Sequence, residues 1–292
     1  MDDFIEYFID YISIEKAAAL STIHKYRADL HRFKNFLLST HYITDFTQVE
    51  LSHVRSYLAF LASSFNYQSS SMANKIIIIK HFFNFLTKSG FILKNPIEMI
   101  KVPRKSKKLP KALNEIELGK LLSAPENLRN NKYKVRDRLI LTLLAYTGIR
   151  RGELLYLDWD DINLGESLLM VRKSKNKESR VIPLHPKVTE LLEAYLTLCL
   201  PLKDKALFLG NQGNRLGRNG LISIFKKYMS FCGVSNKKFS IHSLRHTFAT
   251  QLLRRNANLV SIQQLMGHKR IESTEVYMHV TGKELRESIN FL

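Results

Sequence analysis

The chain has 292 residues, 45% of them hydrophobic, and carries 45 Lys and Arg against 26 Asp and Glu, a formal charge of +19. The hydrophobic content supports a folded core, and the length suits one large or two smaller domains. No apolar run approaches the ~20 residues that span a bilayer, and the opening MDDFIEYFID lacks the basic region of a secretory signal. We therefore expect a soluble, cytoplasmic protein with no membrane partner. The positive charge, which is spread along the chain, predicts a polyphosphate partner.

The cysteine content argues against a disulfide framework and against a zinc site. The chain has only Cys199 and Cys232, and no Cys/His spacing resembles that of a metal site. No Gly-rich phosphate loop is found either, because Gly210, Gly213 and Gly217 do not open a helix after a strand. We expect no metal and no cofactor.

Residues 1–100 are predicted to form a helical domain of about four helices. In STIHKYRADLHRFKNFLLST the apolar residues recur at helical spacing, with Ser21 as the expected N-cap. DDFIEYFIDYI and SHVRSYLAFLASSF show the same pattern. The run Ile76–Ile79 is compatible with a short strand, but the length of its segment, the serines before it and Gly90 after it favour a helix.

Residues 101–112 are predicted to be a basic linker. KVPRKSKKLPK contains six basic residues, two prolines and no acid, which disfavours regular structure. A solvated linker is one interpretation. We favour a linker that crosses a phosphate backbone, because the whole chain is cationic. Its candidate DNA-binding residues are Lys101, Arg104, Lys105, Lys107 and Lys108.

Residues 113–292 are predicted to form a mainly helical domain with a small antiparallel sheet. Asn114 can cap a helix, with Glu117 completing a capping box. YKVRDRLILTLLAYTG is apolar nearly all round, as in a buried helix, and stops at Gly148. Strands are expected at 167–172 and 180–184, and further helices at 187–199, 219–231, 242–255, 258–266 and, as a C-terminal tail, 282–292.

Three segments contain residues suited to phosphate chemistry. Arg150 follows the stop at Gly148 by two residues, with Glu153 as a possible ion-pair partner. In HSLRHTFATQLL, His242 and Arg245 stand at i and i+3 and share one helix face. Arginine grips two phosphate oxygens and histidine transfers a proton near neutral pH, so this pair suits a phosphodiester. The third segment, LMGHKRIESTEVYMHV, places His268 after a helix stop and Tyr277 nine residues later. Taken alone, each segment is better explained by a purely structural role.

In combination, the segments TGIRRGEL, KNKESRVIPL, HSLRHTFAT and LMGHKRIESTEVYMHV resemble the tyrosine recombinase (phage integrase) family, particularly its Xer-type members. The resemblance runs from about Leu113 to Tyr277 and beyond. The helical DNA-clamping domain that usually precedes the catalytic domain in this family fits residues 1–100. The resemblance implies a site-specific recombinase that cuts and rejoins duplex DNA through a 3′-phosphotyrosyl intermediate, without metal or ATP.

The resemblance also implies the role of each residue. Tyr277 is the expected nucleophile, Arg150 and Arg245 clamp the phosphate, and His242 is the acid/base partner of the tyrosine. The remaining implied roles belong to His268, which hydrogen-bonds the phosphate, and to Glu153, which orients the site. His246 is expected to have a packing role, and His185 a turn role.

The resemblance also implies that a lysine on the basic turn, which is predicted between the strands 167–172 and 180–184, protonates the departing 5′-oxygen. Counting eight residues back from Pro183, as the family pattern suggests, selects Lys175. Lys173 and Lys177 would then contact the DNA backbone or solvent.

The expected partners are duplex DNA with an inverted-repeat recombination site and other copies of the chain, four protomers assembling on two sites. A second recombinase or a DNA translocase is a further candidate partner, and the tail helix is expected to dock on a neighbouring protomer, with docking on its own domain as the alternative. Both chromosome or plasmid dimer resolution and mobile-element integration remain open. Two other functions stay in view: DNA relaxation like that of a type IB topoisomerase, and a catalytically silent DNA-binding regulator.

Overall fold

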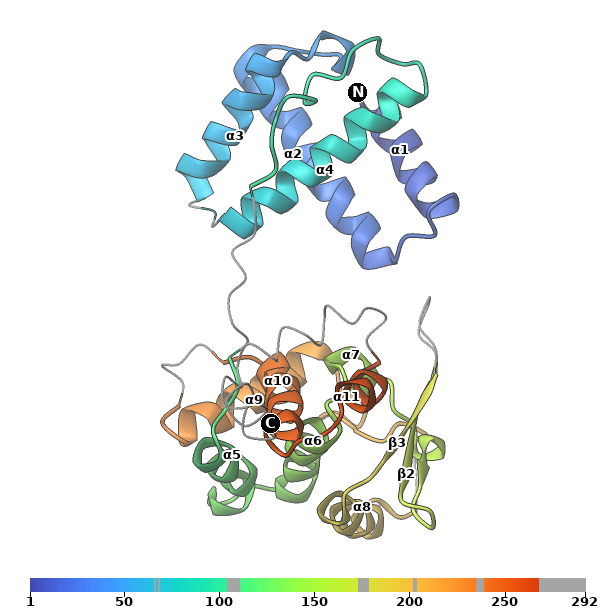
Figure 1. The fold of residues 1–292 in the computed structure, drawn as a ribbon, viewed down its shortest axis with the longest axis vertical. Helices are drawn as coiled ribbons and strands as arrows, with labels where there is room; N and C mark the ends of the chain where they lie inside the picture. Colours follow the sequence, from blue (N-terminus) through green and yellow to red (C-terminus); the bar gives the residue numbers. More distant parts are fainter. Residues whose placement is uncertain are drawn as a thin grey trace, which may run out of the picture. The chain divides into compact units, whose positions relative to one another are not determined.

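The chain divides into two compact units, residues 1–108 and 109–292 (Figure 1). Each unit is built around its own hydrophobic core. The structure is a computed structural model. It describes residues 1–65, 67, 69–103, 111–172, 179–201, 204–234 and 239–267. The predicted tail helix 282–292 and most of the predicted basic linker lie outside the described residues.

The first unit is helical, as predicted. Its core is rich in aromatic residues, with Phe33, Phe82 and Phe83 completely buried among the helices. The four-isoleucine run lies inside a helix, so the helical prediction for Ile76–Ile79 is confirmed. The elements are α1 (Asp2–Ile14), α2 (Leu20–His41), the 3₁₀ turn η1 (Phe46–Gln48), α3 (Leu51–Phe65) and α4 (Ser69–Lys88).

The predicted start of α2 was wrong by two positions. The helix begins at Leu20, and Ala19 is the N-cap residue, with no side-chain hydrogen bond. Ser21 therefore lies within the first turn. A serine before an apolar periodic run is a good but not decisive start signal, because the backbone can bend one or two residues earlier without a side-chain cap.

The second unit is mainly helical with a small antiparallel sheet, as predicted. Its central helix, α6, contacts α5, α8 and α10, and this explains why it is apolar nearly all round. The elements are α5 (Glu115–Asn127), α6 (Lys134–Thr147), α7 (Arg151–Leu155), the 3₁₀ turn η2 (Trp159–Asp161), β1 (Ile162–Asn163), β2 (Leu168–Val171), β3 (Arg180–Pro183), α8 (Pro186–Cys199), α9 (Arg218–Phe231), α10 (Ile241–Arg254) and α11 (Leu259–Met266).

Within the described residues the sheet has three strands in the order β1-β2-β3, all antiparallel. Leu169 is the central position, since it pairs with Ile162 on one side and Ile182 on the other. The predicted strands correspond to β2 and β3. The two-residue β1 was missed, because it is too short to show an alternating pattern.

Local signals in the second unit agree with the prediction. Asn114 and Glu117 form the expected capping box at α5: the Glu117 N–H donates to Asn114 Oδ1 at 2.8 Å, and the Asn114 N–H donates to Glu117 Oε2 at 3.0 Å. Cys199 and Cys232 are half-buried and are not joined in a disulfide. None of the helices in the described part of the chain combines the length and apolar character that crossing a bilayer requires.

Candidate active site

Arg150 owes its position to the way α6 ends. Gly148 adopts a left-handed conformation, φ +60°, which stops the helix and turns the chain toward α7. A Cβ on Gly148 would lie 2.4 Å from Phe248 Cδ1, so a side chain fits neither the backbone angle nor the space. Arg150 then serves as the N-cap residue of α7. The predicted stop at Gly148 is confirmed.

Arg150 and Glu153 form a closed pair at the start of α7. The Arg150 backbone N–H donates to Glu153 Oε2 at 2.8 Å, and Arg150 Nη1 donates to Glu153 Oε1 at 2.8 Å. The second guanidinium nitrogen, Nη2, donates to the carbonyl of Gly267 at 2.6 Å. Arg150 is thus tied both to its own helix and to the residue that ends α11.

Arg180, at the start of β3, completes this cluster and was missed by the sequence reasoning. Its Nη1 and Nη2 donate to the two carboxylate oxygens of Glu153 at 3.1 and 2.8 Å, and its Nε donates to the carbonyl of Leu265 at 2.8 Å. A signal for it existed. Arg180 stands two positions before the buried Ile182 and therefore lies on the same, inward face of β3. A cation on that face needs a buried anionic partner.

The pKa of Glu153 reflects these contacts. Its side chain is only 9% exposed, and burial raises the pKa of the carboxyl. Hydrogen bonds from Arg180 and Arg150 outweigh burial and lower the pKa to about 2. Glu153 is therefore ionised throughout the neutral range.

Arg245 brings three elements together. Ser240 and Ser243 cap α10, and Arg245 lies one turn into that helix with 7% of its surface exposed. Its Nη1 donates to the carbonyl of Gly148 at 2.5 Å and its Nη2 to the carbonyl of Met266 at 2.6 Å. The guanidinium therefore joins α10 to the C-terminal ends of α6 and α11.

His242 lies one turn before Arg245 on α10 and is exposed. Partial burial of the ring lowers its pKa, and the positive charges of Arg151, Arg245 and Arg150 lower it further. The imidazole is therefore neutral at pH 7 and can accept a proton. Arg151, the first residue of α7, thus acts on His242 through its charge.

A groove of about 650 Å³ runs beside these residues. It is lined by both arginines at the start of α7, by His242, and by the end of β2. Its lining residues are Arg150, Arg151, Gly152, Glu153, Tyr156, Leu157, Asp161, Val171, Arg172 and His242. The groove gives an extended anionic ligand access to the cluster.

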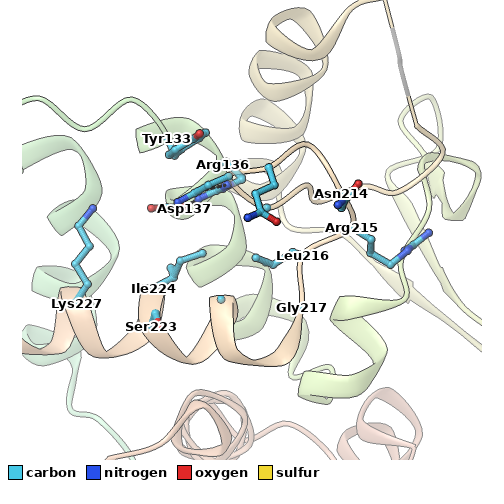
Figure 2. Close-up of a pocket in the computed structure, with 14 residues that line it drawn as sticks. Tyr133, Arg136, Asp137, Asn214, Arg215, Leu216, Gly217, Ser223, Ile224 and Lys227 are labelled. Atoms are coloured by element: carbon cyan, nitrogen blue, oxygen red, sulfur yellow. Dashed lines mark hydrogen bonds and ion pairs between the residues drawn. The ribbon is translucent and has the colours of Figure 1, made fainter.

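A second depression, of about 630 Å³, lies between the start of α6, the loop 210–217 and α9 (Figure 2). Two of its cations, Arg136 and Arg215, are paired within the protein. Arg136 donates to Asp137 Oδ1 at 2.8 Å and lies 4.1 Å from the centre of the Tyr133 ring. Arg215, which extends away from them in Figure 2, is paired with Asp158. Because both arginines of this depression are already paired with carboxylates, the groove beside α7 is the better candidate site.

Some of the remaining residues named in the sequence analysis lie within the described ranges, and others lie outside them. Lys101 is exposed at the end of the first unit. His246 is half-buried, as expected for packing, and His185 is the N-cap of α8, with its ring accepting the N–H of Lys187 at 3.2 Å. The residues that lie outside the described ranges are Arg104, Lys105, Lys107, Lys108, Lys173, Lys175, Lys177, His268 and Tyr277.

The site also contains no obvious metal-binding group among the residues that the structure describes. There, His, Cys, Asp and Glu do not gather in threes or more. The chemistry that the described residues offer is cationic: two half-buried or buried guanidinium groups and a neutral imidazole beside an open groove. This set suits the binding of a phosphodiester.

Comparison with known proteins agrees with the fold and with the family that the sequence resembles. A model of the phage integrase family matches residues 111–284, and a model of the phage integrase N-terminal SAM-like domain matches residues 5–90. The tyrosine recombinase XerD of Staphylococcus epidermidis is 35% identical over 98% of this chain and 97% of its own length.

Solved structures show the same architecture. The XerA recombinase matches with a TM-score of 0.56 and 27% identity, covering 99% of this chain and 97% of that one. The XerH site-specific recombinase, in a post-cleavage complex with its palindromic difH substrate, matches with a TM-score of 0.77 and 24% identity, covering 94% and 80%. The fold and the family match define a DNA strand transferase, and the chain belongs to the phage integrase family. Within that family it is an Xer-type tyrosine recombinase.

Proposed function

We propose that this protein cuts and rejoins duplex DNA at a specific site, with Tyr277 as the nucleophile. The observation that carries the proposal is the convergence of Arg150, Arg245 and His242. Arg150 comes from the start of α7 and the other two from α10, yet both guanidinium groups donate to adjacent carbonyls, those of Gly267 and Met266. The chain that continues from this point leads to His268 and Tyr277.

In the proposed cleavage step, the Tyr277 hydroxyl attacks the scissile phosphorus while His242 accepts its proton. The new bond joins the tyrosine oxygen to phosphorus, and the bond from phosphorus to the 5′-oxygen breaks. Lys175 gives a proton to that oxygen, which leaves as a 5′-hydroxyl. Arg150, Arg245 and His268 stabilise the charge on the phosphate oxygens in the transition state. The rejoining step is the reverse, with the 5′-hydroxyl of another strand as the attacking group.

The charge and pKa relations support this assignment. A tyrosine titrates near pH ~10 and needs a proton acceptor to react at neutral pH. The lowered pKa of His242 makes its imidazole available as that acceptor. The scheme needs neither metal nor ATP, because arginine and lysine supply the positive charge and the phosphotyrosyl bond conserves the energy of the broken diester.

We assign residues 1–100 as the DNA-clamping domain, 101–112 as the linker and 113–292 as the catalytic domain. The linker residues Lys101, Arg104, Lys105, Lys107 and Lys108, together with Lys173 and Lys177 on the turn, are proposed to contact the phosphate backbone. The proposed target is an inverted-repeat site, on which pairs of protomers assemble and two occupied sites form a tetramer. A second recombinase or a translocase is a further proposed partner. The protein is proposed to act in the cytoplasm.

Covalent trapping on a nicked suicide substrate tests the proposal. DNA fragments from the genomic neighbourhood of the gene supply the candidate sites. Wild type should form a covalent protein–DNA complex and Tyr277→Phe should not. Tyr156→Phe is the matched control, because this exposed tyrosine lines the groove but has no proposed role. Specific binding without cleavage by wild type would instead support a silent regulator, and relaxation of plasmids that lack the site would support a topoisomerase.

A further inference from the structure

The carboxylate of Glu153 is shared between two arginines, and each of its oxygens accepts two hydrogen bonds. Oε1 accepts from Arg150 Nη1 and Arg180 Nη1, and Oε2 accepts from the Arg150 backbone N–H and Arg180 Nη2. The three side chains are well shielded: Glu153 is 9% exposed, Arg180 12% and Arg150 24%. This geometry uses the planar fork of Arg180, which lysine does not have.

The same guanidinium also holds the end of α11. Arg180 Nε donates to the carbonyl of Leu265 at 2.8 Å. Its side chain lies flat against Gly267, where a Cβ would be 3.0 Å from Nη1 and 3.2 Å from Cδ. Gly267 has φ +62°, so its lack of a side chain serves both the turn and this contact. Arg180 therefore joins β3, the start of α7 and the end of α11.

The charge balance of the cluster has a consequence for phosphate binding. Two guanidinium groups share one carboxylate, so the cluster carries a net positive charge. Without Arg180, Glu153 would neutralise Arg150 one to one and would accept only the bonds that Arg150 donates. A phosphate would then compete with a fully paired salt bridge for Arg150.

We infer that Arg180 is a positioning residue for strand cleavage, which holds Glu153 so that Arg150 stays correctly oriented and incompletely neutralised for the scissile phosphate. The inference rests on the proposed function. Arg180 itself does not touch the phosphate in this account. It acts through Glu153 and through the end of α11, and it does so from the strand that follows the turn bearing Lys175.

The test compares Arg180→Lys and Arg180→Met with matched changes at Arg215. Arg215 is also half-buried, donates to the carbonyls of Leu155 and Leu157, and pairs with Asp158, but it lies outside the groove beside α7. Each full-length variant is first checked for folding by urea denaturation, read by fluorescence. DNA affinity and the single-turnover rate of covalent-complex formation are then measured separately on the suicide substrate.

We expect Arg180→Met to slow cleavage about a hundredfold and Arg180→Lys about tenfold, the size of loss that a misplaced catalytic group produces, while affinity for the site changes less than about threefold. The Arg215 variants should stay within about threefold of wild type in cleavage, even where they lose comparable stability. If Arg180→Met fails to fold, the cleavage rate of Arg180→Lys tests the inference, because lysine keeps the positive charge but lacks the planar guanidinium.

The pH profile separates positioning from general weakening of the fold. Arg180 is the largest contributor that lowers the pKa of Glu153, and burial opposes it. Its loss should raise that pKa, so that Arg180→Met gains an acidic limb in its cleavage rate near or above about pH 4.5, the ordinary region for a glutamate. Protonation of His242, the proposed proton acceptor, gives every variant one acidic limb. Wild type and the Arg215 variants should lack the additional limb that Glu153 produces in Arg180→Met.

Several results would overturn the inference alone. They are cleavage by Arg180→Met within about threefold of wild type, a loss no larger than that of Arg215→Met, or the same pH profile in all variants. Absence of any covalent complex with wild type is a different outcome. It would overturn the proposed function, and the positioning role would fall with it.

Discussion

The pairing of Glu153 with two arginines predicts a specific loss of stability in Glu153→Gln. The carboxyl has a pKa of about 2 instead of the ordinary 4.5. At about 1.4 kcal/mol per pKa unit, this interval corresponds to roughly 3 kcal/mol of stabilisation at pH 7. The value agrees with the ~3–5 kcal/mol that is lost when one partner of a buried ion pair is removed.

The loss should depend on pH in a defined direction. A carboxyl whose pKa is depressed by folding stabilises the protein above its unfolded-state pKa, and this contribution fades as the pH falls toward the folded-state value. The relevant window runs from about 4.5 down to about 2. The difference between wild type and Glu153→Gln should therefore shrink from roughly 3 kcal/mol at pH 7 to roughly 1.5 kcal/mol at pH 3.

Urea denaturation followed by tryptophan fluorescence measures the unfolding of the second unit, which contains Glu153. Trp159 is the sole tryptophan of the chain, and it stacks on Tyr195 at 5.8 Å within the second core. Glu126→Gln is the matched control, because Glu126 pairs with Arg138 at the surface and should contribute less than about 1 kcal/mol. A Glu153→Gln loss below about 1 kcal/mol, or one that is equal at pH 7 and pH 3, would refute the reasoning.

Two further predictions concern residues next to Arg150 in the sequence. Gly148→Ala should destabilise the second unit by about 2–4 kcal/mol, because it adds left-handed strain and a clash with Phe248. Gly119→Ala, in an open helical position, should be neutral or slightly stabilising, and an equal effect of both changes in urea denaturation would contradict this account. Arg151→Met should raise the pKa of His242, since a nearby cation is removed; an NMR titration of the ring that shows no change or a lower pKa would be incompatible with it.

Short-range patterns made much of the site predictable from sequence. The helix stop at Gly148 predicted where Arg150 lies, and the three-residue spacing predicted its pairing with Glu153. The spacing of His242 and Arg245 on one helix also predicted their proximity, although not that one would be exposed and the other buried. Such features depend only on neighbouring residues and on the helical period.

Contacts between distant segments could not be predicted in the same way. Arg180 meets Glu153 across 27 positions of sequence and the carbonyl of Leu265 across 85. Arg245 donates to the carbonyl of Gly148, a backbone acceptor to which no side-chain pattern points. These contacts exist only once α10 has packed on α6, and α11 on α10 and β3. A single arginine on the inward face of a strand is the signal that a sequence reader can use in advance.

The most direct test of the central claim is to locate the covalent bond to DNA. The wild-type protein is trapped on a suicide substrate and digested with protease and nuclease, and the peptide that retains nucleotide is sequenced by mass spectrometry. The account predicts a nucleotide linked through a 3′-phosphate to Tyr277 and to no other of the 12 tyrosines of the chain. A phosphodiester link to any other residue would contradict it.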